Sequence, residues 1–177
     1  SYDRAPHFKK IISELCCDIL AVQEIIGYSG EEYFYNEIIS QINQEYLRAP
    51  FIDDPYSSLD QTLYYKPSID LISTSYIPTD LRNINEFILA FENDTFIVYN
   101  FHLKASPDYE SWRLSDIQTL NENINNNYPN ILLGDYNIYT SAEPAFQYLI
   151  NEMQLTDPLD LPDWQNDQYG WTHTQNT

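Results

Sequence analysis

The chain has 177 residues, of which 27 are acidic and 8 are basic, so its formal net charge is −19. Hydrophobic residues make up 43% of the sequence and aromatic residues 15%, which excludes an intrinsically disordered chain. No apolar run reaches the roughly 20 residues of a membrane-spanning helix, and no basic block offers the usual footprint for a nucleic acid. The acidic charge is compatible with a site that first recruits a divalent cation. The length predicts a single domain over residues 1–177.

The first third of the chain predicts two helices around one strand. Apolar residues recur at helical spacing over 6–19 and again over 31–46, and the nearly continuous apolar run at 18–25 predicts a buried strand between them. Cys16 and Cys17 are adjacent and are the only cysteines, so no disulfide framework is expected. We expect them to act as small apolar residues on a buried helix face.

The remaining elements complete an α+β order. Strands are predicted at 61–65, 69–73, 86–91 and 95–102, a helix at 112–124, a strand at 130–134 and a helix at 143–151. Residues 157–177 are rich in Asp, Pro, Asn and Gln and are expected to form a loop, although Trp164, Trp171 and His173 are unusual there. Several successive strands between helical segments predict hairpin-connected strands in the middle and helices outside.

Two predicted strands end in polar residues that packing alone would not select. The buried strand predicted at 18–25 ends on Glu24, directly after its apolar residues, and His102 ends the strand at 95–102. Lys104 comes two residues after His102 and therefore points to the same side of an extended segment. Each residue alone also has an ordinary structural explanation; a histidine at a strand end, for example, is often only a hydrogen-bonding group.

A third strand ends in a similar way. Asp135 and Asn137 follow Gly134 on one side of an extended segment, and the glycine removes a side chain where another group could come close. An aspartate after a glycine is also a common turn residue. A hard cation such as Mg²⁺ takes one or two carboxylate oxygens, several waters and often a substrate phosphate, and Glu24 and Asp135 could supply those oxygens.

The order of these motifs resembles that of the endonuclease/exonuclease/phosphatase superfamily. Its members include pancreatic deoxyribonuclease, apurinic-site endonucleases, inositol-polyphosphate phosphatases and neutral sphingomyelinases. The resemblance is carried by residues 21–24, 101–104 and 133–137. Within the superfamily, residues 61–66, 137–146 and 173–175 are similar to secreted bacterial endonuclease-like members, which favours a secreted or periplasmic bacterial protein.

The resemblance implies a four-layered α/β sandwich, with two mostly antiparallel sheets face to face and helices outside. It also implies hydrolysis of a phosphoester with Mg²⁺, or alternatively Mn²⁺ or Ca²⁺. Matched to the family motifs, Glu24 would bind the metal and His102 would act as an acid or base or contact the phosphate. Asp135 would orient or deprotonate the attacking water beside the metal, and Asn137 would hold the phosphate or a metal-bound water.

Three further residues are candidates without a family-wide motif. Lys104 and Arg82 could contact a phosphate by virtue of their charge. Glu86 could pair with His102, as an acidic partner does in pancreatic deoxyribonuclease.

The chain departs from the family pattern at both ends. Family members open with a strand that carries an asparagine and close with a strand that carries an Asp-His pair or an equivalent acidic segment. Neither is present in residues 1–177. We therefore expect an incomplete domain that lacks the first and last strands, taken from a unit of about 250 residues, and inactive by itself.

The predicted function is a divalent-metal-dependent phosphodiester hydrolase, most simply a monomeric nuclease-like enzyme whose substrate is a nucleic acid or another phosphodiester. A phosphatase or a phospholipid phosphodiesterase of the same superfamily is the alternative. The third possibility is a catalytically inactive acidic domain that binds a partner, because sixteen tyrosines and three tryptophans suit a contact surface.

Overall fold

The computed structural model describes residues 4–155. The N-terminal part contains α1 (Ala5–Leu15), β1 (Ile19–Ile25), α2 (Gly27–Glu37), the 3₁₀ turn η1 (Ile39–Gln41), β2 (Leu47–Arg48) and β3 (Asp60–Tyr65). The C-terminal part contains β4 (Asp70–Ile77), β5 (Ile84–Phe91), β6 (Asp94–His102), the 3₁₀ turn η2 (Pro107–Tyr109), α3 (Glu110–Asn123), β7 (Asn130–Asp135) and α4 (Pro144–Asn151). No helix in this range is long and apolar enough to cross a membrane.

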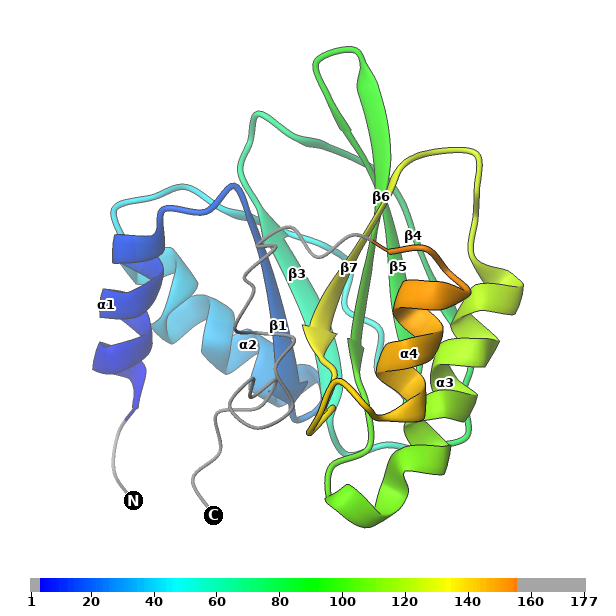
Figure 1. Cartoon of the computed structure of the whole chain (residues 1–177). Coiled ribbons are helices and arrows are strands. Elements are labelled where there is room, and N and C mark those ends of the chain that lie inside the picture. Colours follow the sequence, from blue (N-terminus) through cyan, green and yellow to red (C-terminus); the bar gives the residue numbers. More distant parts are fainter. Residues whose placement is uncertain (1–3, 156–177) are drawn as a thin grey trace.

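These elements form four layers (Figure 1). Helices α1 and α2 cover a three-stranded antiparallel sheet of order β1-β3-β2, which faces a four-stranded sheet of order β4-β5-β6-β7 covered by α3 and α4. The second sheet is antiparallel except for its last pair, because β6 and β7 run parallel. Parallel neighbours need a crossover connection, and η2 with α3 supplies it. The predicted α+β sandwich is confirmed.

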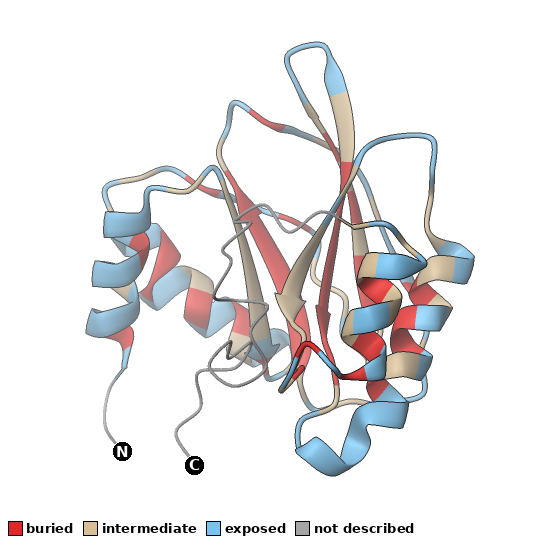
Figure 2. Ribbon diagram, in the orientation of Figure 1, coloured by how far each residue is buried: buried red, intermediate tan, exposed pale blue. Residues whose placement is uncertain are grey.

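The apolar side chains gather in three cores between these layers. Phe34 belongs to the core under α1 and α2, Leu63 and Val98 belong to the core between the sheets, and Ile117 and Leu149 belong to the core under α3 and α4. Figure 2 shows the same arrangement as buried stretches on the strands and on the helix faces turned toward them. The alternation of apolar residues in the sequence thus decides which face each element buries.

The predicted helix at 31–46 is partly wrong. The helix begins earlier, at Gly27, and ends at Glu37, after which the backbone of Ile38 leaves the helical region. Ile38, Ile39 and Tyr46 are still buried in the core under α1 and α2. Their spacing indicated burial correctly, but two adjacent β-branched residues favour helix weakly, and packing holds them as a 3₁₀ turn and loop.

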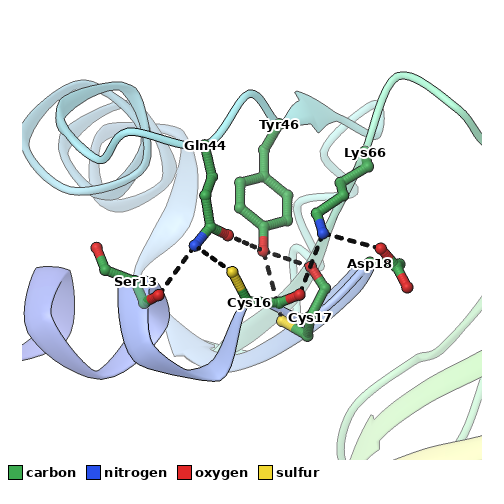
Figure 3. A network of polar contacts seen from close by, with 7 residues as sticks. All are labelled: Ser13, Cys16, Cys17, Asp18, Gln44, Tyr46 and Lys66. Atoms are coloured by element: carbon green, nitrogen blue, oxygen red, sulfur yellow. Dashed lines mark hydrogen bonds and ion pairs between the residues drawn. The ribbon is translucent and has the colours of Figure 1, made fainter.

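The junction between α1 and β1 corrects the expectation for the two cysteines. The predicted helix at 6–19 ends at Leu15, because Cys16 adopts a left-handed conformation that caps the helix. Cys16 is exposed and Cys17 is half-buried, and both thiols are free. Figure 3 shows what fixes the turn: the ammonium of Lys66 donates to the carbonyl of Cys16 and to the Asp18 carboxylate, and the hydroxyl of Tyr46 donates to the carbonyl of Cys17.

Two expectations concern chain outside the described residues. The loop predicted at 157–177 and the motif at 173–175 lie there. Within residues 4–155, β1 forms one edge of the first sheet and β7 one edge of the second, and most residues of both strands are half-buried. That a further strand belongs to each sheet stays a prediction.

Candidate functional site

The candidate site lies where β1, β6 and β7 end. His102 is the last residue of β6 and Asp135 the last of β7, and the parallel register pairs them directly. Glu24 lies near the end of β1, in the opposite sheet, and β1 and β7 run side by side in Figure 1 and are in contact. The sandwich therefore brings together three of the strand-end residues that the sequence singles out.

The imidazole of His102 lies between two carboxylates. Its Nε2 is 4.0 Å from Oε1 of Glu24 and 3.9 Å from Oδ2 of Asp135. The His102 side chain is only 5% exposed, whereas those of Glu24 and Asp135 are 65% and 40% exposed. The two acidic groups thus face solvent above a buried ring.

The surroundings keep His102 neutral at physiological pH. Burial lowers the pKa of His102 below its ordinary value, and the guanidinium of Arg82 lowers it further, while Asp135 and Glu24 act in the opposite direction. Nδ1 of His102 is buried and has no hydrogen-bond partner among residues 4–155. With two carboxylates facing Nε2, the electrostatics favour the tautomer that carries the proton on Nε2.

A backbone irregularity presents Glu24 to solvent. The pairing of β1 with β3 shifts register between Val22 and Ile25, which is a β-bulge. Glu24 has φ of +64°, a left-handed conformation that costs a non-glycine residue free energy. Strained backbone of this kind is concentrated at functional sites.

Gly134 allows β7 to approach β6. A Cβ atom at this position would lie 2.1 Å from the carbonyl oxygen of Phe101, and φ of Gly134 is +152°, a value that L side chains rarely adopt. The sequence analysis expected another group to come close to Gly134, and the carbonyl of Phe101 is that group. Without this close approach, Asp135 could not lie beside His102.

Asn137 is held close to Asp135. Its backbone N–H donates to Oδ1 of Asp135 at 2.9 Å, and its side-chain Nδ2 donates to the carbonyl of Leu103 at 3.0 Å. Its φ of +47° is left-handed, a conformation that asparagine tolerates well. Asn137 therefore lies at the site and orients the Asp135 carboxylate; its contact with phosphate or water stays a prediction.

Arg82 is also brought to the site. Its Nη1 donates to the backbone carbonyl of His102 at 3.0 Å, and its charge interacts with Glu24 and Asp135. Burial lowers the pKa of Arg82, although a guanidinium stays charged at any physiological pH. The site therefore holds one fixed positive charge among its carboxylates.

Two candidates are engaged elsewhere. The ammonium of Lys104 lies over the ring of Tyr109, 4.7 Å from its centroid, beside η2. Glu86 is not the partner of His102, because its carboxylate accepts hydrogen bonds of 2.7 Å from the hydroxyls of Ser75 and Tyr99. The reason is register: Glu86 pairs with Tyr99 across the sheet, three residues from His102 and so on the other face.

Sequence reasoning missed two supporting groups. Asn100 is fully buried between the sheets, and its position within the apolar end of a strand was the available signal. Arg113 is also fully buried, and it stands on the same helix face as Ile117 and Leu120, where a charge is unexpected.

The residues present fit a hard divalent cation in part. Oε1 of Glu24 and Oδ2 of Asp135 are 4.0 and 3.9 Å from the same atom, Nε2 of His102. The two oxygens are therefore at most about 8 Å apart. Mg²⁺ takes oxygen ligands at about 2.1 Å and keeps several waters. One carboxylate could thus bind such an ion directly and the other through water. The part of the chain that the structure describes has no group of three or more His, Cys, Asp or Glu arranged for a metal.

Comparisons with known proteins address the fold. No family model and no curated protein matches the sequence. Solved structures do match: D. rerio TDP2 complexed with a single-strand DNA product has a TM-score of 0.62 at 17% identity, over 78% of this chain and 55% of that one. The human Nocturnin catalytic domain with a bound sulfate anion has a TM-score of 0.62 at 18% identity, over 82% of this chain and 62% of that one.

A third match is ANGEL2, described as a 2',3'-cyclic phosphatase, in complex with adenosine-2',3'-vanadate. Its TM-score is 0.56 at 17% identity, over 82% of this chain and 47% of that one. The chain thus spans about half to three fifths of the length of these structures. All three have the same sandwich, so the chain has the fold of the endonuclease/exonuclease/phosphatase superfamily that its motifs predicted.

Proposed function

We propose that the protein is a divalent-metal-dependent phosphodiester hydrolase of the endonuclease/exonuclease/phosphatase type. The observation that carries this proposal is the convergence of Glu24 and Asp135, from opposite sheets, on the buried Nε2 of His102. A pair of solvent-facing carboxylates over a neutral imidazole is unfavourable as packing but suits a hydrolase.

Glu24 and Asp135 would hold the ion, which would be Mg²⁺, Mn²⁺ or Ca²⁺. When bound, such an ion neutralises charge on a phosphate and lowers the pKa of a water molecule. Asp135, oriented by the N–H of Asn137, accepts the proton of the attacking water. Neutral His102 donates a hydrogen bond from its Nε2–H to a phosphate oxygen or the leaving oxygen, the leaving oxygen takes its proton from water, and Arg82 supplies a fixed positive charge beside them.

We propose a nucleic acid as the substrate. The TDP2 match holds a single-strand DNA product. The net charge of −19 opposes binding of a polyanion, but screening confines that repulsion to about 8 Å at physiological salt. A phosphatase of the same fold is the second candidate, because the ANGEL2 match is described as a 2',3'-cyclic phosphatase. Export and a monomeric state stay predictions from the sequence.

The test uses the full-length protein with three substrates: bis(p-nitrophenyl) phosphate, p-nitrophenyl phosphate and single-stranded DNA. We expect hydrolysis of the diester and of DNA with Mg²⁺ or Mn²⁺ and none with excess chelator. Asp135→Asn should lower the rate roughly 100-fold or more. Asp94→Asn removes the same charge from the exposed far end of β6 and should have no effect. Full activity in chelator, or an unimpaired Asp135→Asn variant, contradicts the proposal, and turnover of the monoester alone favours the phosphatase.

A further inference from the structure

A buried ion pair joins α3 to the start of α4. Arg113 lies in the first turn of α3, and Glu143 is the residue that precedes α4. Nε of Arg113 donates to Oε1 of Glu143, and the two side chains are 0% and 1% exposed. Neither group touches Glu24, His102 or Asp135 by any hydrogen bond or ion pair within residues 4–155.

The pair holds the two loops that leave the site. Nη1 of Arg113 donates to the carbonyls of Lys104 and Ser106, at 2.7 and 2.8 Å, in the loop after β6. Oε2 of Glu143 accepts the backbone N–H of Tyr139, at 3.2 Å, in the loop after β7. The guanidinium of Arg113 also lies 5.4 Å from the ring centroid of Tyr139. One ion pair thus anchors both loops.

The same two loops are joined again closer to the site. The N–H of Leu103 donates to the carbonyl of Asp135 at 2.9 Å, and Nδ2 of Asn137 donates to the carbonyl of Leu103 at 3.0 Å. Further out, the N–H of Ser106 donates to the hydroxyl of Tyr139 at 3.0 Å. A displacement of either loop therefore displaces Asn137, whose N–H orients the Asp135 carboxylate.

The energetics of the Arg113–Glu143 pair indicate that it positions the two loops more than it stabilises the fold. Burial removes both charges from water, and apolar residues of similar volume often replace such a pair without loss of stability. Nη2 of Arg113 is buried and has no hydrogen-bond partner among the described residues, which adds a desolvation cost. What the pair uniquely supplies is a fixed geometry, since a guanidinium presents its donors in a rigid planar fork.

We propose that Arg113 and Glu143 are positioning residues, which fix Asn137 and through it the carboxylate of Asp135 in the orientation needed for hydrolysis. The proposal rests on the function proposed for the site. Arg113→Lys keeps the charge but loses the fork, so it should lower kcat about 10- to 100-fold and leave KM within a few-fold. Arg48→Lys, an equal change in the ion pairs of Arg48 with Glu31 and Glu32, is the matched control and should leave kcat unchanged.

A double-mutant cycle with Asn137→Ala separates positioning from general damage. If Arg113 acts through Asn137, Arg113→Lys should lower kcat less than about 3-fold in the Asn137→Ala background. The double variant Arg113→Met with Glu143→Leu leaves no charge unpaired, but the carbonyls of Lys104 and Ser106 and the N–H of Tyr139 lose their partners, so it should melt below the wild type. It should also lose kcat at a temperature where it is folded. Strictly additive losses, or wild-type kcat in a folded Arg113→Lys variant or in the double variant, overturn the proposal.

One measurement does not depend on turnover. The backbone amide of Asn137 is bonded to Asp135, so its hydrogen exchange should be about 10-fold faster in Arg113→Lys and unchanged in Arg48→Lys. If the wild-type protein hydrolyses no phosphodiester, the proposed function fails, and this exchange rate still decides whether Arg113 positions Asn137. An unchanged rate in Arg113→Lys contradicts positioning.

Discussion

The side-chain amide of Gln23 on β1 donates a 2.7 Å hydrogen bond to the amide oxygen of Asn100 on β6. Nδ2 of Asn100 also donates to the carbonyls of Val22 and Thr62, at 3.3 and 2.9 Å, so one buried side chain on the second sheet bonds two strands of the first. Gln23 directly precedes Glu24 in the chain, and Asn100 lies two residues before His102. The distance between Glu24 and His102 therefore depends on this link.

Replacing Asn100 by leucine should destabilise the fold by about 2–4 kcal/mol. The leucine has a similar volume, but it leaves two carbonyls and the Gln23 amide without their partner in a buried environment. Urea unfolding of the full-length protein measures the change. Asn36→Leu, on the exposed face of α2, is the control and should shift stability by at most about 0.5 kcal/mol. An Asn100→Leu variant as stable as the wild type would show that the link is dispensable.

Gly134→Ala should destabilise the protein by about 3 kcal/mol or more. The added methyl group would overlap the carbonyl of Phe101, and alanine would be strained at φ of +152°. Gly30→Ala is the matched control: it lies in α2, its Cβ would meet neighbours at ordinary van der Waals distance, and alanine favours helix. We expect the control to be neutral or stabilising by up to about 1 kcal/mol. Equal effects of the two substitutions in a denaturant titration would contradict this account of the strand contact.

Asp116 should make stability depend on pH. Burial, and to a smaller extent the charge of Asp80, raise the pKa of Asp116 to about 6, while a hydrogen bond from Thr79 and the charge of Arg82 lower it. The folded state then keeps a proton that the unfolded chain has lost, so stability decreases as pH rises from about 4 through 6. Asp116→Asn cannot ionise and should gain stability relative to the wild type over that range, by up to about 3 kcal/mol.

Unfolding of both proteins at pH 4, 5, 6 and 7 measures this difference. The comparison isolates Asp116, because every other titrating group is common to both. Asp94→Asn at the exposed start of β6 controls for the loss of one negative charge. A difference between wild type and Asp116→Asn that does not change with pH would mean that Asp116 titrates normally.

Glu24→Asn should increase stability and abolish hydrolysis. Asparagine is better tolerated than glutamate at φ of +64°, so we expect a gain of about 1 kcal/mol, while the loss of the carboxylate removes one proposed metal ligand. Glu92→Asn is the matched control, because Glu92 has φ of +55° in the turn between β5 and β6. It should gain similar stability and keep full activity. A Glu24→Asn variant that still hydrolyses phosphodiesters would exclude Glu24 from the site.

Most of the fold could be predicted from the sequence, because apolar periodicity is a local property. The six predicted strands were placed correctly, although β4 and β5 extend beyond their predicted bounds, since pairing between Ile77 and Ile84 continues the hairpin past the apolar run. The two-residue strand β2 was not predicted. The end of α2 could not be predicted, because Ile38 and Ile39 carry the right spacing for a helix and tertiary packing overrides it.

Site residues could be predicted only where a local feature of the sequence, such as the end of an apolar run, marks them. Glu24, His102 and Asp135 each follow an apolar run, so their positions at strand ends are visible in the sequence. The pairing of Glu86 with Tyr99 depends on strand register, which the sequence does not display. The link through Asn100 depends on how two sheets face each other, and no local pattern encodes that relationship.

The parallel pairing of β6 and β7 determines when the site can assemble during folding. The β5–β6 hairpin closes across a short turn, whereas β7 can join β6 only after α3 has crossed back over the sheet. We therefore expect Asp135 to reach His102 only after the β5–β6 hairpin has formed. A cation that requires both carboxylates would bind only the assembled sandwich, and by mass action it would draw the folding equilibrium toward that state.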